Sequence, residues 1–300
     1  MVNKALLGSL FIQPKQQYYL VDKRNSFTRK ENYLCKEKEY SVQIIYPAQL
    51  FSPKIPDEAY AQEYECAREK GLHCLLLSSD AAAMGEYRFS TAFQPGNPAI
   101  WRGWMMSDRE YRQLCSAVAK KGVEMMTSPE AYLRCHYLPG WYDLCREFTP
   151  ETEVVAADAD FDALLSRLPW PAFFVKDYVK SLTTARGSVA HNAEEVREII
   201  QLLQKFRGEI TGGICLRRFE DFRKESEKRY FVLHKKVFAA DDFIPESVKE
   251  IAERIESPFF SVDMIENKQG ELRLVEIGDG QVSDSKAWPV DRFIGMLLTG

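Results

Sequence analysis

The chain has 300 residues, of which 45% are hydrophobic and 28% charged, and its formal net charge is -4. This composition is typical of a globular protein with one large or two medium domains. The slightly acidic balance argues against general binding to nucleic acids or membrane surfaces, because both need a basic excess. No stretch approaches the roughly 20 apolar residues that would span a bilayer, so we expect no membrane partner.

Seven cysteines are scattered along the chain, and no two of them form a Cys-x-x-Cys motif. This pattern favours reduced thiols over a disulfide framework or a zinc site. The apolar start at residues 5–12 is too short and too interrupted for a secretory signal. Together these features predict a cytoplasmic protein.

Residues 1–40 are polar and aromatic, and this N-terminal extension forms either two short strands or a flexible segment. Strands and helices alternate beyond it. Strands are expected over 40–46, 72–78 and 123–126, and helices over 57–70, 107–122 and from 128 onward. The alternation predicts a mainly parallel sheet, which we assign to a small α/β domain over residues 41–150.

An acidic segment with a proline, residues 149–162, marks the expected domain boundary, so the second domain is assigned to residues 151–300. Asn192 and Glu195 have the spacing of a helix cap. The apolar face of that helix consists of Val196, Ile199, Ile200 and Leu203. Other elements expected in this domain are strands over 173–181, 214–219 and 229–233, a helix over 247–255, and a hairpin of 259–266 and 271–277.

The hairpin carries two acids in otherwise apolar strands. If its loop is residues 267–270, Asp263 faces Leu274 and Glu276 faces Ser261. Asp263 and Glu276 are then diagonal neighbours on one face, about 7–8 Å apart at the backbone. Two carboxylates that close can share a magnesium ion, although a one-residue slip would separate them. Alternatively, either acid is an ordinary solvated strand residue.

Basic residues mark two further strands. Lys176 and Lys180 are expected to share one strand face, where a nucleotide phosphate would offset their burial; an edge strand with solvated lysines is the alternative. Arg217 and Arg218 end another strand, and Arg229 begins the next. Guanidinium groups bind phosphates and carboxylates through a fixed fork of donors. Adjacent arginines point to opposite faces, so only one of the first pair should reach a site.

Six short motifs resemble, in order and spacing, an ATP-grasp branch found in phages and bacteria and named for two arginines and a lysine. They are WRGWM (101–105), RCHYL (134–138), VKDYVKS (175–181), Arg217–Phe219, FFSVD (259–263) and VEIGDGQV (275–282). The resemblance covers roughly residues 41–285. It implies an ATP-grasp fold of two α+β lobes that hold the nucleotide between them, preceded by a small α/β domain.

The resemblance also implies roles for the basic residues. Lys176 would contact the phosphates of ATP, with Lys180 assisting in binding and catalysis. Arg217 and Arg229 would stabilise the transferred phosphoryl group or the substrate carboxylate, and Arg229 would also contact the nucleotide. Members of the branch usually have an acid at the position of Arg218.

Acidic residues receive roles by the same resemblance. Asp263 and Glu276 would ligate magnesium, and Asp279 and Gln281 would supply a further metal contact or meet the acceptor. Glu220 is the candidate substitute for the acid expected near the adenine or ribose.

We therefore expect an ATP-dependent carboxylate–amine ligase that needs ATP and magnesium, forms an acylphosphate and releases ADP. Its substrates would be small-molecule or peptide carboxylates and amines. One alternative is a non-catalytic nucleotide-binding or interaction protein on the same scaffold. Another, a nucleic-acid joining or modifying enzyme, is disfavoured by the acidic balance. Four histidines are too dispersed for a metal site; His136, in RCHYL, either approaches the substrate or has the structural role that we favour.

Overall fold

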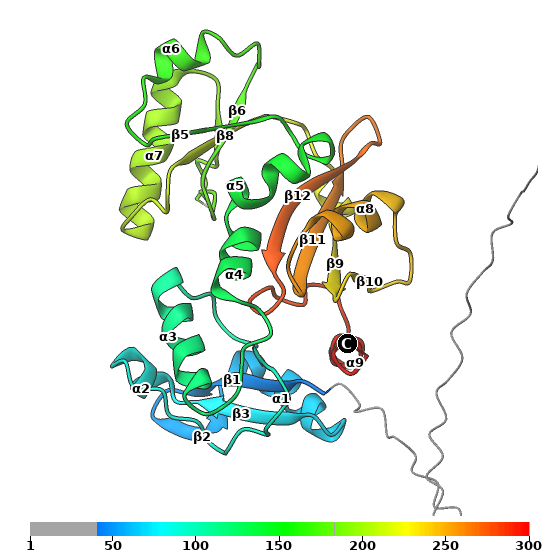
Figure 1. The fold of residues 1–300 in the computed structure, drawn as a ribbon. Helices are drawn as coiled ribbons and strands as arrows, with labels where there is room; N and C mark the ends of the chain where they lie inside the picture. The colour runs from blue at the N-terminus through cyan, green and yellow to red at the C-terminus, as the bar shows by residue number, and fades with distance from the viewer. Residues whose placement is uncertain (1–40, 183, 300) are drawn as a thin grey trace, which may run out of the picture. The chain divides into compact units, whose positions relative to one another are not determined.

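Three four-stranded sheets organise residues 41–182 and 184–299, the part of the chain that the computed structural model describes (Figure 1). The expected N-terminal extension over residues 1–40 lies outside the described residues. Within them, no helix has both the length and the apolar character needed to cross a membrane.

The first sheet is mainly parallel, as predicted. It consists of β1 (Gln43–Gln49), β2 (Ser52–Pro56), β3 (His73–Leu77) and β4 (Ala99–Trp101). β1 pairs in parallel with β3 and β4, and only β2 pairs with it in the antiparallel direction. The strand expected over 123–126 is wrong, since that segment makes only an isolated bridge between Met125 and Ala99.

Short helices accompany this sheet. They are η1 (Glu58–Tyr60), α1 (Ala61–Glu69), α2 (Ser79–Ala83), α3 (Asp108–Ala119), α4 (Pro129–His136), α5 (Leu138–Trp141), η2 (Tyr142–Leu144) and η3 (Arg146–Phe148). α3 begins where the sequence predicts, because the Ser107 hydroxyl accepts from the amide of Glu110 and the Glu110 carboxylate accepts from the amide of Ser107.

The second sheet is antiparallel, in the order β5-β8-β6-β7. Its strands are β5 (Thr152–Val155), β6 (Phe173–Asp177), β7 (Val189–Ala190) and β8 (Ile214–Arg218), accompanied by α6 (Phe161–Leu165) and α7 (Ala193–Arg207). The predicted apolar face of α7 is buried in a cluster with residues of β6 and β8. Asn192 caps α7, because its side chain accepts from the amide of Glu195.

The third sheet is also antiparallel, in the order β10-β9-β11-β12. It comprises β9 (Lys228–Leu233), β10 (Lys236–Ala239), β11 (Phe259–Glu266) and β12 (Leu272–Asp279), with η4 (Lys224–Ser226), α8 (Glu246–Arg254) and α9 (Val290–Leu297). Alternate residues of β9 and β11 belong to two separate cores. One contains the apolar face of α8, and the other contains α9 together with residues of the first sheet. The division of the chain at residue 150 stays a prediction.

Candidate active site

Four of the residues predicted for the site line one cavity of about 100 Å³. Lys180, Arg229, Glu276 and Asp279 contribute to its wall, together with His136 and residues of the segment that follows β12. They come from four parts of the chain: the turn after β6, the start of β9, the end of β12 and the end of α4. α4 contacts β12 directly (Figure 1).

Asp263 and Glu276 lie closer together than the sequence predicts. They are direct partners across β11 and β12, whereas Met264 pairs with Leu274. The predicted pairing of Asp263 with Leu274 is wrong because a β-bulge at Val275 shifts the register between these two pairs. The extra residue retains both acids on one face and places them opposite each other.

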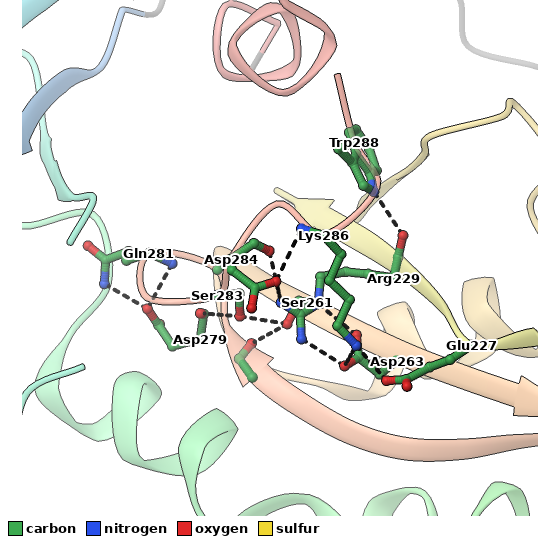
Figure 2. A network of polar contacts seen from close by, with 12 residues as sticks. Glu227, Arg229, Ser261, Asp263, Asp279, Gln281, Ser283, Asp284, Lys286 and Trp288 are labelled. Carbon is green, nitrogen blue, oxygen red and sulfur yellow. Dashed lines mark hydrogen bonds and ion pairs between the residues drawn. The ribbon is translucent and has the colours of Figure 1, made fainter. Parts of the chain in front are cut away.

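The carboxylate of Asp263 is already bonded to two cations. Arg229 donates from Nε to Oδ1 and from Nη2 to Oδ2, both at 2.7 Å, and Lys286 donates to Oδ2 at 2.9 Å (Figure 2). Burial acts to raise the pKa of Asp263, but the bonds and charges of Arg229 and Lys286 outweigh it and lower the pKa. Arg229 Nη1 also donates to the backbone carbonyl and carboxylate of Asp284. Arg229 therefore ties β9 and β11 to the segment after β12.

The two lysines do not share a strand face, which corrects the prediction. β6 ends at Asp177, whose Oδ1 accepts from the amides of Val179 and Lys180 and reverses the chain. Lys176 stays within β6 and is 5% exposed, with its Nζ 3.5 Å from Oε1 of Glu276. Lys180 reaches the cavity from beyond the turn. The two ammonium groups thus approach the same region from different segments.

Arg217 and Arg218 point to opposite faces, as predicted. Arg218 is exposed and lies 3.5 Å from the carboxylate of Glu151. Arg217 is buried; Nη1 donates to the carbonyl of Val275 and Nη2 to Oγ1 of Thr149. Its Nε has no hydrogen-bond partner among the described residues, and burial lowers the pKa of Arg217 to about 10. Arg217 therefore fixes β8 against the bulge of β12 and retains one unused donor.

Glu220 is separated from the other predicted residues by its partner. Both carboxylate oxygens accept from Arg273 of β12, at 2.9 and 3.0 Å. It does not line the cavity described above. Its predicted contact with the adenine or ribose would have to replace this bidentate pair.

Asp279 and Gln281 form a buried junction with the first sheet. Oδ1 of Asp279 accepts from the backbone amide and the side-chain Nε2 of Gln281, whereas Oδ2 has no partner in the part of the chain that the structure describes (Figure 2). Burial raises the pKa of Asp279 to about 7. Gln281 in turn accepts from the amide of Trp101 and donates to the hydroxyl of Tyr111. Gln281 therefore holds the segment in place rather than lining the cavity.

Sequence reasoning missed Arg102 as the second anchor of this segment. Arg102 is 2% exposed, and its Nε and Nη2 donate to the two carboxylate oxygens of Glu63 at 2.7 and 2.8 Å. Its Nη1 donates to the carbonyls of Gly280, Gln281 and Ser283. The motifs WRGWM and VEIGDGQV thus contact each other. A charged residue directly after an apolar strand was the available signal.

Comparison with known proteins identifies the architecture. Residues 166–297 match a family model described as an ATP-grasp domain, the third family of its clade. The RimK domain protein ATP-grasp from Sphaerobacter thermophilus is similar with a TM-score of 0.55 and 15% identity, over 87% of this chain and 100% of that one. The chain has an ATP-grasp fold. The predicted fold class is confirmed.

Two other solved structures are similar to a comparable extent. D-cycloserine synthetase DcsG has a TM-score of 0.55 and 13% identity, over 85% of this chain and 98% of that chain. The ATP-grasp ligase PsnB, complexed with a variant of its minimal precursor, Mg and ADP, has a TM-score of 0.56 and 11% identity, over 87% and 100%. Among proteins of curated function, none matches the chain by sequence. Likeness at these identities establishes the fold alone.

The residues present fit the nucleotide that an ATP-grasp fold implies. Lys176 is a buried ammonium with a long, 3.5 Å carboxylate contact, and Arg217 has a buried donor that no described residue satisfies. Both are groups that an anion would satisfy.

Magnesium fits a smaller set of ligands than predicted. Within residues 41–182 and 184–299, no three His, Cys, Asp or Glu side chains are grouped as around one metal ion. Glu276 and Asp279 line the cavity, and Oδ2 of Asp279 is not bonded to any described residue. Because magnesium is usually held by one or two carboxylates plus phosphate oxygens, these two acids would suffice. Asp263 could join them only by releasing Arg229 or Lys286.

Proposed function

We propose that this chain is an ATP-dependent carboxylate–amine ligase that works through an acylphosphate and releases ADP and phosphate. The observation that carries the proposal is the cavity in which Lys180 and Arg229 meet Glu276 and Asp279 on an ATP-grasp fold. Phosphoryl transfer needs positioning and charge stabilisation more than covalent chemistry, and this wall offers both signs of charge.

Each basic residue then has a distinct task. Lys176 and Lys180 bind the phosphates of ATP from two directions, and Arg217 offers its unused Nε from the side of β8. Arg229, held by Asp263 and Asp284, presents a fixed positive charge to the transferred phosphoryl group. These cations offset the charge that develops on the phosphoryl oxygens.

The acidic residues provide the metal end of the proposed site. Glu276 and Asp279 would hold magnesium, which when bound neutralises phosphate charge during transfer. Asp263 keeps Arg229 in position. A role for Asp263 as a direct metal ligand belongs to the proposal only if its ion pairs exchange when the metal binds.

The substrate class is part of the proposal. D-cycloserine synthetase is named for a small-molecule product, and PsnB was complexed with a minimal precursor. We infer a small-molecule or peptide carboxylate as donor and an amine as acceptor, joined in the cytoplasm. The chemistry of the cavity does not require nucleic acid.

An ADP-release assay tests the proposal. Purified protein is mixed with ATP, magnesium, a panel of carboxylates, and hydroxylamine as a general amine, and ADP and hydroxamate are measured together. Lys176→Ala and Glu276→Gln should each abolish most of the turnover, whereas Glu86→Gln, an exposed acid outside the cavity, should not. ADP production that survives both site substitutions would remove the site assignment, and AMP as product would remove the acylphosphate route.

The alternative is a nucleotide-binding protein without catalysis. It is favoured by Glu220 and Asp263, whose carboxylates are already bonded to arginine or lysine side chains. Calorimetry separates the two proposals. Binding of ATP and magnesium without ADP release from any carboxylate and amine pair would support this second function.

A further inference from the structure

His136 is a wall residue of the cavity to which the proposed chemistry assigns no task. It is the last residue of α4, is 8% exposed, and lines the cavity with Lys180 and Glu276. Its Nε2 is buried and has no hydrogen-bond partner within residues 41–182 and 184–299. A buried nitrogen left unpaired costs free energy, so an atom of this kind beside a ligand cavity indicates a partner supplied by the ligand.

The imidazole ring is held in a fixed orientation. It stacks on Tyr132 with ring centroids 5.1 Å apart and planes 15° apart, and Tyr132 stacks on Tyr111 at 4.2 Å and 15°. Both tyrosines are anchored at their hydroxyls. Tyr132 donates to the carbonyl of Met106 and accepts from its amide, and Tyr111 donates to the carbonyl of Thr127. The column holds the imidazole without using Nε2.

The surrounding charges keep this histidine neutral. Burial and then the positive charges of Lys180 and Lys176 lower its pKa to about 4, with Glu276 acting in the opposite direction. A neutral imidazole has one nitrogen that accepts a hydrogen bond. With the proton on Nδ1, Nε2 is that acceptor.

We infer that His136 receives a proton from the amine that attacks the acylphosphate, which makes it a catalytic residue for the second half of the reaction. The inference rests on the proposed ligase function. It also restricts the acceptor to an amine that is protonated in water, such as a primary alkyl amine, since only that amine must lose a proton before it can attack.

The step balances without a further reagent. Nε2 of His136 takes one proton from the ammonium, and the freed nitrogen lone pair attacks the acyl carbon. A C–N bond forms and the C–O bond to phosphate breaks, so that phosphate leaves with the electron pair. It accepts the second proton that the nitrogen loses on becoming an amide. Bound phosphate groups offset the charges of Lys176 and Lys180, which makes the imidazole more basic during the step than it is in the free protein.

Two nucleophiles of similar size test the inference. Hydroxylamine is largely unprotonated at neutral pH, whereas methylamine is an alkyl ammonium, and each is supplied with ATP, magnesium and a carboxylate that the wild-type protein accepts. His136→Phe preserves a stacking ring and removes both nitrogens. We expect it to lower methylamide formation by about a hundredfold, the usual scale of general base catalysis, and to leave hydroxamate formation close to wild type.

Other variants separate this role from a structural one. His136→Gln keeps a hydrogen-bond acceptor that takes no proton, so it should show the same selective loss even if the phenylalanine variant fails to fold. Calorimetry with ATP and magnesium verifies that each variant binds nucleotide. His191→Phe, at an exposed histidine beside the start of α7, should change neither product.

The outcomes divide cleanly. Equal loss of both products in the two His136 variants, or methylamide formation at the wild-type rate in either, overturns the role of His136 and leaves the ligase proposal intact. Neither product from the wild-type protein with any carboxylate overturns the ligase proposal itself, and the inference falls with it.

Discussion

The two sides of the cavity differ in how completely their charges are paired. On the side of β6 and β8, Lys176 has a carboxylate contact at 3.5 Å, and Nε of Arg217 has no partner in the described chain. On the side of the segment after β12, Arg102 and Arg229 bond to carboxylates and carbonyls at 3.1 Å or less. Unpaired buried charge is costly, whereas paired charge fixes geometry. We interpret the first side as the ligand surface and the second as its support.

Removing a cation from the supporting side should have the largest effect on stability. Arg102→Met leaves the Glu63 carboxylate and three backbone carbonyls without their donor in a buried site. Breaking a buried pair in this way typically costs about 3–5 kcal/mol, and we expect that loss in the free energy of unfolding measured with urea.

Arg112→Met is the matched control for this prediction. Arg112 makes two ion pairs, but it and both partners are exposed. Exposed pairs contribute about 0–1 kcal/mol, so the unfolding curve should move little. If Arg102→Met proved as mild as Arg112→Met, the distinction between a supporting side and a ligand side would fail.

Removing a cation from the ligand side should affect binding instead. Lys176→Met retains the length of the side chain and removes an ammonium whose contact with the Glu276 carboxylate is long. Charged hydrogen bonds are worth about 1.5–3 kcal/mol, so calorimetry should find ATP binding roughly tenfold to a hundredfold weaker in the presence of magnesium. The free energy of unfolding should stay the same or rise, because a buried charge is gone.

Lys121→Met provides the comparison, since Lys121 is exposed and outside the cavity. It should leave both binding and unfolding unchanged. A large loss of stability in Lys176→Met with unaltered nucleotide affinity would show that Lys176 supports the fold rather than binding phosphate.

Local signals in the sequence predicted several elements of this fold correctly. The Asn192 cap and the buried face of α7 follow from spacing alone, because both depend on residues within one helix. The placing of Asp263 and Glu276 on one face also followed from strand alternation.

The errors arise where distant or unusual contacts decide the geometry. The bulge at Val275 has no distinctive residue, and it shifts the pairing by the amount that loop length cannot reveal. Lys180 leaves the strand because the side chain of Asp177 captures two backbone amides. The partners of Arg102 include a carbonyl 178 residues away, so no local pattern identifies them.

Asp279 is the exception on the supporting side, and it makes the comparison testable by pH. Its Oδ2 is unbonded within the described residues, and burial raises the pKa from 3.8 to about 7. The folded protein therefore holds this proton to a higher pH than the unfolded chain does. The resulting stabilisation is complete below pH 3.8, decreases as the pH rises and is lost above about 7.

Asp279→Asn should remove this dependence, because the amide is neutral at every pH in that window. Urea unfolding at pH 5 and pH 7 should show the variant gaining about 1–2 kcal/mol relative to wild type between the two values. Bound magnesium would reverse the sign for the wild-type protein, because a metal favours the ionised carboxylate. A difference between variant and wild type that stays constant with pH, with and without magnesium, would place Asp279 among the paired charges and exclude it as a metal ligand.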